Sequence, residues 1–383
     1  MEQTWRWFGP DDKVSLADIR QAGAAGIVTV LHPLSPGAPW TESETAYGQA
    51  RIAEGFDGAI RWQVVESLPV PEETERLGPS MAADIAAYQA TQEALAAAGL
   101  QVICSNVMPA LVWAHTDLCA PLDHGGRAMR FDLTRLVVFD DHILGRAEAS
   151  ESCGEDEAAV ADCAVRGMND AEIEELVHTA GTGLPSLAKR RTLEGLRLLA
   201  LVTYGGVDAA RLRQAHVDFL SEAAPLAEEL GLRLCCHPDD PPVALSGLPR
   251  AMSRAEDYAR LRDAVDNPAV GTTLCTGSLG APADDNPVEI VRRFGSRIHF
   301  AHLDGQTEMV AVIAVKLEEE TLHRTEGRKD AGIPGRLDHG REILSELTAG
   351  AQPGYPAVGH LNGLAELRGV TAAFQAHPQR RAA

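Results

Sequence analysis

The chain carries little positive charge for its length. Its 383 residues include 34 Lys and Arg against 55 Asp and Glu, which gives a formal net charge of −21. A phosphate backbone needs a basic protein surface, so this balance argues against nucleic acid as a partner. A small anionic substrate remains compatible, because a bound cation and a few local Arg or Lys side chains can reverse the field inside one cleft.

The sequence marks of membranes, export and disulfide frameworks are also missing. No apolar run is long enough to cross a bilayer, and residues 1–12 lack a basic start followed by an apolar block. We therefore expect neither a membrane span nor a signal peptide. The seven cysteines are odd in number and contain no CxxC spacing. Such usage is typical of reduced thiols, so we expect a cytoplasmic protein.

Short apolar runs recur along the chain. Most consist of consecutive apolar residues and do not alternate between apolar and polar residues. This pattern is typical of strands that are buried on both faces. Helical stretches separate the runs, among them 15–22, 81–98 and 211–230. The alternation predicts an α/β fold, a (β/α)8 TIM barrel. The predicted strands are 4–8, 27–31, 61–66, 101–106, 233–236, 271–275, 298–302 and the residues that lead to Asp338.

One interval, between Asn106 and Arg233, is far longer than a single crossover needs. We interpret it as a helical insertion after strand 4, within 110–230 of a single barrel domain that spans 1–383. Inside it, the acidic segment 147–164 is predicted to be mobile, whereas 170–177 and 187–199 are predicted to be helical. Such an insertion could form a lid or a dimer contact.

Four potential metal ligands close, or directly follow, predicted strands. They are His237, Cys275, His302 and Asp338. The strands of an α/β barrel present their functional side chains at the C-terminal rim, so these four residues are expected at one site. Imidazole, thiolate and carboxylate form a soft-to-borderline ligand set for a divalent cation. The pattern predicts a metal centre, and its thiolate would also admit Zn²⁺.

Other polar residues at strand ends are candidates for substrate contact. Glu66 and Asn106 close the third and fourth strands, and Asp239 follows His237 in the segment HPDDPP. Plainer roles compete with this one: the strand-end residues could satisfy loop amides, and the acidic pair Asp239-Asp240 could form turns beside its prolines. Surface or packing roles suffice for the remaining histidines, which are His115, His124, His142, His178, His216, His299, His323 and His377.

Nine motifs, taken in order along the chain, resemble the mannonate dehydratase family. They are MEQTWRWFGP, VSLADIRQAG, VVES, NVMP, HPDDPP, CTGS, LDHG, PGY and GLAELRG, and the likeness extends from Met1 to about Gly369. The resemblance implies a xylose-isomerase-like barrel that converts D-mannonate to 2-keto-3-deoxy-D-gluconate and water in hexuronate breakdown. It also implies a divalent metal, Mn²⁺ or Fe²⁺ by the habit of the family.

The resemblance carries over to individual residues. It implies the same four metal ligands and adds Tyr355 and His339 as a pair that transfers protons, without deciding which is acid and which is base. It implies a small sugar acid as the partner and adds His32, after the second strand, to the substrate-contacting residues. By analogy with barrel enzymes of this kind, we expect a homo-oligomer, a dimer.

The sequence departs from the family pattern around the expected substrate. The loop after His302 is shortened. Leu303 stands where the family has Arg, His32-Pro33 where it has His-His, Val112-Trp113 where it has Asp-Trp, His360 where it has Arg, and Leu337 where it has Pro. Three alternatives therefore stay open: a dehydratase for another aldonate, a sugar isomerase or epimerase on the same barrel, or a metal-binding homologue without turnover.

Overall fold

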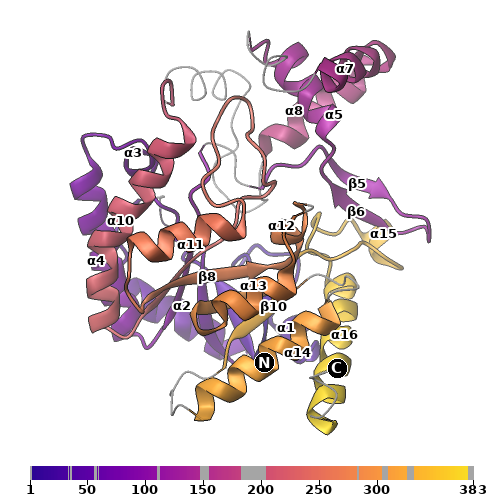
Figure 1. The fold of residues 1–383 in the computed structure, drawn as a ribbon. Coiled ribbons are helices and arrows are strands. Elements are labelled where there is room, and N and C mark those ends of the chain that lie inside the picture. The colour runs from indigo at the N-terminus through magenta and orange to yellow at the C-terminus, as the bar shows by residue number, and fades with distance from the viewer. Residues whose placement is uncertain are drawn as a thin grey trace.

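Eight parallel strands form a closed barrel (Figure 1). The structure, a computed structural model, describes residues 2–377 except 33, 35–36, 56–57, 59, 110–112, 147–154, 183–203, 283, 304–308 and 326–331. Around the barrel the strand order is β1-β10-β9-β8-β7-β4-β3-β2. Because each strand pairs in parallel with its neighbours, all eight C-terminal ends lie at one rim. The predicted (β/α)8 barrel is confirmed.

The observed strands follow the predicted runs closely. They are β1 (Glu2–Arg6), β2 (Gly26–Thr29), β3 (Arg61–Glu66), β4 (Val102–Ser105), β7 (Arg233–Cys236), β8 (Val270–Cys275), β9 (Ile298–Leu303) and β10 (Pro334–Leu337). The main difference lies in β1 and β2, which end before the apolar runs 4–8 and 27–31 do. Phe8, for example, is buried although it lies beyond the last residue of β1.

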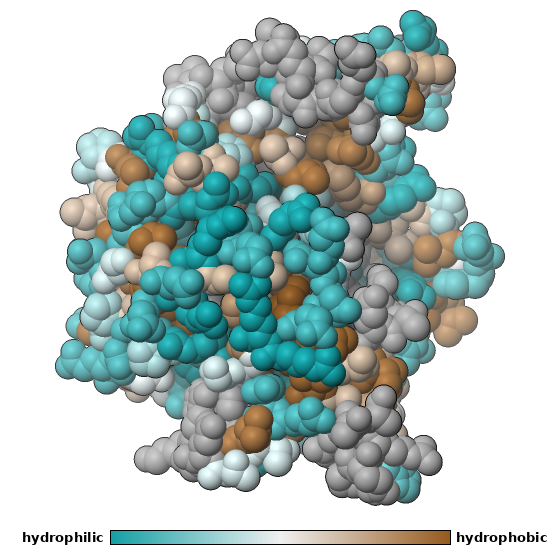
Figure 2. All heavy atoms as spheres, in the orientation of Figure 1, coloured by the Kyte–Doolittle hydropathy of each residue, from teal (hydrophilic) through white to brown (hydrophobic). Residues whose placement is uncertain are grey.

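Helices surround the barrel and present a largely hydrophilic outer face in the view of Figure 2. The first helix begins at Leu16 after the N-cap Ser15, whose capping box with Asp18 satisfies free amides of the first turn. None of the described helices combines the length and apolarity that a membrane span requires. The helices that cover the barrel or its rim are α1 (Leu16–Gln21), α2 (Glu42–Gly55), α3 (Glu72–Glu75), α4 (Met81–Ala97), α10 (Ala209–Glu229), α11 (Ala255–Ala264), α12 (Thr276–Gly280), α13 (Pro287–Phe294), the 3₁₀ turn η3 (Gly295–Arg297), α14 (Met309–Thr325), α15 (Glu346–Ala349) and α16 (Ala357–Ala376).

A small apolar layer fills the interior of the barrel below its functional rim. Cys104 and Cys235 belong to it as small buried core residues. The ring of Phe300 lies 4.7 Å from that of His302, centroid to centroid, so His302 stands directly on this layer. The members of the layer are Val28, Val64, Val102, Cys104, Cys235 and Phe300.

The insertion between β4 and β7 contains more than helices. A two-stranded antiparallel hairpin, β5 (Asp117–Pro121) and β6 (Arg127–Arg130), opens it. The predicted helical insertion is present, and the hairpin is an additional element that the sequence did not predict. The turn of the hairpin contains Gly125, whose φ of 85° explains why the chain has glycine there. The helical elements that follow are α5 (Leu133–Val137), the π-helix η1 (Val138–Ile143), α7 (Glu155–Gly167) and α8 (Asp170–Thr182).

One of the predictions for the insertion can be judged, and one lies outside the described residues. The predicted helix 170–177 is confirmed by α8. Residues 155–164 form most of α7, and the mobility of 147–164 stays a prediction. In that helix Ala161, Ala164 and Val165 recur at helical spacing and pack in an apolar cluster with Phe139, while acidic residues occupy other positions. The predicted helix 187–199 lies in the segment that the structure does not describe.

The hairpin is fastened to the segment that follows β10. The backbone of Arg127 exchanges two hydrogen bonds with that of Glu342, at 3.0 and 2.8 Å. The Arg127 guanidinium also lies 3.0 Å from a carboxylate oxygen of Glu342 and donates to the Leu347 carbonyl at 2.9 Å. Figure 1 shows the hairpin beside α15 at this junction. The insertion therefore reaches back over the C-terminal rim of the barrel.

Candidate metal centre and active site

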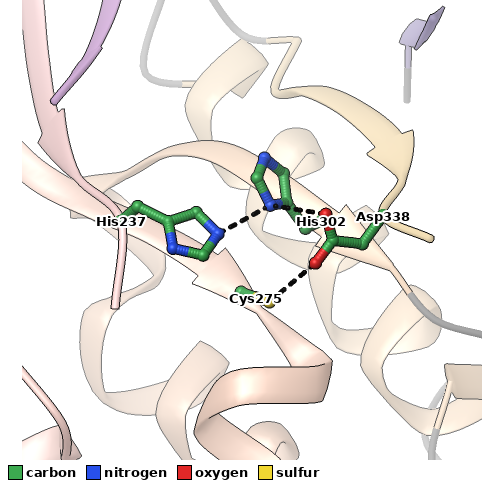
Figure 3. A group of neighbouring side chains, drawn as sticks. All are labelled: His237, Cys275, His302 and Asp338. Carbon is green, nitrogen blue, oxygen red and sulfur yellow. Dashed lines mark hydrogen bonds and ion pairs between the residues drawn. The ribbon is translucent and has the colours of Figure 1, made fainter. Parts of the chain in front are cut away.

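The four predicted metal ligands converge at the C-terminal rim. One donor atom each from His237, Cys275, His302 and Asp338 lies within 4.8 Å of all the others, and all four side chains are buried (Figure 3). They come from the ends of four consecutive strands of the chain, β7 to β10. Cys275 and His302 are also register partners across β8 and β9, which places their side chains side by side.

The donor atoms are spaced as ligands of one cation would be. The distance from His237 Nε2 to His302 Nδ1 is 2.9 Å, and Cys275 Sγ lies 3.3 Å from Asp338 Oδ2. His302 Nδ1 lies 3.4 Å from Asp338 Oδ1. A tetrahedral ion with bonds of about 2.0–2.3 Å separates its ligand atoms by about 3.3–3.8 Å. Since the observed separations are close to this range, the donor set fits a single divalent ion with little movement.

His237 is held with its Nε2 toward the other ligands. Its Nδ1 lies 2.6 Å from the Pro238 carbonyl and donates to it. Burial, followed by the charge of His302, lowers the pKa of His237 to about 3. A neutral imidazole with one nitrogen bound to a carbonyl offers the other as a lone pair, which is the form that ligates metals.

His302 is oriented by a buried carboxylate. Its Nε2 lies 2.9 Å from Glu66 Oε1, so its Nδ1 faces the other donors. Glu66 is in turn held by Arg336, whose Nε and Nη2 donate to its two carboxylate oxygens at 3.0 and 3.2 Å. Burial lowers the pKa of His302, but the carboxylates of Glu66 and Asp338 outweigh this and Arg336, and the net shift is upward.

Arg336 also positions the fourth ligand, Asp338. Its Nη1 lies 2.9 Å from Asp338 Oδ1 and donates to the carbonyls of Leu337 and Asp338, each at 3.0 Å. Burial alone would raise the pKa of Asp338. The neighbouring His339, His302 and Arg336 together hold its pKa well below its usual range, so this predicted ligand is an anion.

Tyr355 and His339 lie together beside the metal-ligand cluster. The Tyr355 hydroxyl is 3.3 Å from His339 Nε2, and His339 Nδ1 is 3.9 Å from Asp338 Oδ2. Burial raises the pKa of Tyr355 and lowers that of His339. Phe8 packs edge-on to the Tyr355 ring, and His360, at a position where the family has Arg, stacks on it with centroids 5.5 Å apart.

A cavity of about 810 Å³ opens next to this pair. This volume lies within the range of small-molecule sites, about 300–1,000 Å³. Its walls come from the hairpin, from the segment after β10 and from the first part of α16. Polar side chains that line it include His115, His124, Asp240, His339, Arg341 and Glu366.

None of the four predicted substrate-contacting residues lines this cavity in the described structure. Glu66 is buried against Arg336 and His302, as above. Asp239 Oδ2 accepts from the Met252 amide and the Ser253 hydroxyl. Asn106 is buried, and the ring of His32 lies 3.1 Å from the Thr29 hydroxyl. Their contact with substrate stays a prediction, whereas Asp240, the neighbour of Asp239, does line the cavity.

The sequence reasoning missed two residues at this site. Arg336 occupies an inward-facing position two residues before Asp338, and a charged residue in an otherwise buried strand was the signal that could have identified it. His115 was expected to have only a surface or packing role, yet it lines the cavity and its ring lies 5.9 Å from that of His339. No sequence motif marks His115, because the fold of the insertion brings it there.

Comparison with known proteins agrees with this site. The family model for D-mannonate dehydratase (UxuA) matches residues 1–381. Mannonate dehydratase 1 of Agrobacterium fabrum (strain C58) is 46% identical over 390 residues, which cover 97% of this chain and 96% of that protein. The mannonate dehydratase of Rhizobium meliloti (strain 1021) is 45% identical over 394 residues, 98% of this chain and 97% of the relative.

A solved structure supports the fold independently of close sequence identity. The mannonate dehydratase of Streptococcus suis serotype 2 superimposes with a TM-score of 0.73 at 23% identity, covering 98% of this chain and 95% of the other. At this identity the match concerns the fold alone. The family model and the two relatives match nearly the whole length, and on that ground this chain belongs to the D-mannonate dehydratase family.

Proposed function

We propose that this protein is a metal-dependent hydro-lyase that converts D-mannonate to 2-keto-3-deoxy-D-gluconate and water. The observation that carries the proposal is the buried cluster of two imidazoles, a thiol and a carboxylate within 4.8 Å at the barrel rim. Its relatives are mannonate dehydratases at 46% and 45% identity, which supports the same reaction. The neighbouring cavity suits a small polar substrate.

His237, Cys275, His302 and Asp338 would hold the ion. We propose Mn²⁺ or Fe²⁺, with Zn²⁺ as a competitor that the thiolate of Cys275 favours. When bound, a divalent ion supplies Lewis-acid stabilisation for negative charge that develops on oxygens of the substrate. Glu66 and the Pro238 carbonyl fix the two imidazole rings, so the protein holds both nitrogen ligands in place in advance.

Tyr355 and His339 would carry the proton transfers. Dehydration of a sugar acid removes the proton alpha to the carboxylate and expels the β-hydroxyl, so the site must accept one proton and donate another. The contact of 3.3 Å between the phenol and the imidazole allows a proton to pass from one to the other. We therefore assign acid and base to the pair jointly.

The biological setting is part of the same proposal. The reaction would serve hexuronate breakdown in the cytoplasm. The six described cysteines form no disulfide, which supports a reducing compartment. A dimeric assembly stays a prediction.

The reaction itself is the first test. The purified protein, loaded with Mn²⁺, is expected to form a 2-keto-3-deoxy acid from D-mannonate, measured by keto-acid detection across a panel of aldonates. Activity on another aldonate alone would change the substrate but keep the reaction. Deuterium uptake into recovered substrate without keto acid would indicate an isomerase or epimerase. Metal binding without any turnover would contradict the hydro-lyase.

Cys275→Ala is expected to weaken metal binding by about a hundred-fold or more. Loss of a residue that only orients a ligand costs about 10–100-fold, and this variant removes one of the four proposed ligands itself. The bound metal is measured by elemental analysis and by calorimetric titration with Mn²⁺. Cys104→Ala is the matched control, since Cys104 is equally buried inside the barrel but belongs to the apolar layer. Equal metal binding by both variants would show that Cys275 is not a ligand.

Tyr355→Phe is expected to lower kcat by roughly 10²–10⁴-fold, the usual contribution of a positioned proton donor or acceptor. Metal content should be unchanged, because Tyr355 is not among the four donors. Tyr88→Phe is the control: Tyr88 is also buried but packs against Phe219, between α4 and α10. A Tyr355→Phe enzyme with the wild-type kcat would exclude the phenol from proton transfer.

Glu66→Gln separates two roles for Glu66. If the carboxylate orients His302, metal affinity falls about 10–100-fold while KM at saturating Mn²⁺ changes little. If Glu66 contacts substrate, KM rises and metal affinity is kept. We expect the first result, because Glu66 is only 2% exposed and both of its oxygens contact Arg336 or His302. Glu75→Gln, at a buried glutamate bonded to Tyr204, controls for the loss of a buried charge.

A further inference from the structure

His115 belongs to the insertion yet lies at the active site. It precedes β5 by two residues, is 9% exposed, and lines the same cavity as His339. The two rings meet edge to face, with centroids 5.9 Å apart and planes at 90°. A residue from outside the eight barrel strands thus stands next to the pair that would transfer protons.

The hydrogen bonds of His115 define what its ring can bind. Its ring is hydrogen-bonded to the backbone of Ala114, whereas Nε2 is buried and has no partner in the structure. We assign Nδ1 as the nitrogen that donates to the Ala114 backbone, which leaves Nε2 without a proton. Burial lowers the pKa of His115 to about 4, so the ring is neutral near pH 7. A neutral imidazole whose Nδ1 carries the proton presents Nε2 as an acceptor.

Other buried atoms of the described structure also lack hydrogen-bond partners, but Nε2 of His115 belongs to a residue that lines the cavity. Among the described residues that line the cavity, His115 alone has a buried side-chain atom without a hydrogen-bond partner. His216 in α10 also lacks partners, but it lies outside the cavity among packed helices, where a packing role suffices. His124 lines the cavity, but its Nδ1 accepts from the Gly126 amide of its own turn.

The chemistry of an acceptor selects its ligand. A lone pair at Nε2 repels a carboxylate or phosphate oxygen and accepts a hydrogen bond from a hydroxyl group. The proposed substrate, a sugar acid, carries several hydroxyls. We propose that His115 is a substrate-contacting residue whose Nε2 accepts a hydrogen bond from one hydroxyl of the bound sugar acid, and this inference rests on the proposed function above.

The attachment of the insertion supports this role. The strands of the hairpin begin directly after His115, and Arg127 of β6 is fastened to Glu342 by two backbone hydrogen bonds and an ion pair. Glu342 lies three residues beyond His339. This contact joins the hairpin to the segment after β10, so it helps to fix the position of His115 relative to the barrel rim before substrate binds.

The test compares His115→Phe and His115→Gln with a control variant, His216→Phe. Phenylalanine keeps a planar ring but removes the acceptor, and kcat/KM for D-mannonate is expected to fall about ten-fold or more. Glutamine offers an acceptor oxygen and should restore part of the loss. His216→Phe makes the same change at a buried, unpartnered histidine outside the cavity and should keep the wild-type kcat/KM. Metal content and Tm are measured for every variant.

Deoxy substrates give a readout that a packing role would not change. The analogues are 4-deoxy-, 5-deoxy- and 6-deoxy-D-mannonate. For the wild-type enzyme, kcat/KM should fall with any analogue that lacks a hydroxyl contacted by the protein. In His115→Phe, one of these analogues should cost nothing further, because its hydroxyl has already lost its partner. Equal losses in both enzymes for all three analogues, or a wild-type kcat/KM in His115→Phe, would overturn the inference. If His115→Phe does not fold, His115→Gln is compared across the same series.

Calorimetry keeps this inference distinct from the proposed reaction. D-Mannonate is titrated into Mn²⁺-loaded wild-type protein and into His115→Phe, a measurement that does not require turnover. Binding that weakens about ten-fold in the variant supports the contact, even if neither protein forms a keto acid and the hydro-lyase is thereby rejected. Equal affinity of the two proteins would overturn the contact while leaving the hydro-lyase intact.

Discussion

The guanidinium of Arg336 is the interaction on which the barrel rim depends. It pairs with both oxygens of Glu66 and lies 2.9 Å from Asp338 Oδ1. This single guanidinium therefore links two carboxylates, one beside each ring nitrogen of His302. Moving each such charge out of water costs on the order of several kcal/mol, and only well-placed partners offset this cost. Here the bidentate contact and two further bonds to backbone carbonyls offset that cost, and the positions of His302 and Asp338 are fixed as a result.

This arrangement explains why a strongly acidic protein can present an anionic cluster for a cation. Arg336 balances part of the charge of Glu66 and Asp338, but a deprotonated Cys275 would add another negative charge to the same buried space. A divalent ion would complete the balance. With an ion bound, the two imidazoles would contribute neutral nitrogens, because the second nitrogen of His237 faces a carbonyl and that of His302 faces a carboxylate. The donor set is thus organised for a metal by contacts that are already present in the protein.

The strands and the ligand set could be predicted because they follow from local rules. A continuous apolar run that ends in one polar residue locates a barrel strand, and parallel strands bring those ends together. The supporting contacts could not be predicted in the same way. Glu66 and Arg336 meet across the barrel from β3 and β10, 270 positions apart, and no local pattern identifies such a pair. Glu66 therefore looked like a cleft residue in sequence, whereas it is buried behind His302.

The insertion was the least predictable part, and this limit has a physical reason. Its hairpin and α7 are stabilised by contacts with other segments, such as the bridge from Arg127 to Glu342 and the packing of Ala161 near Phe139. The barrel strands would fix the metal-binding residues, whereas the cavity beside them is lined in part by the insertion. Loops and insertions at the C-terminal rim can change without disturbing the barrel. The sequence follows this division: all four predicted metal ligands are present, and the departures from the family pattern lie around the expected substrate. A change of substrate in this family would therefore be encoded in residues such as His115, which no strand-end rule identifies.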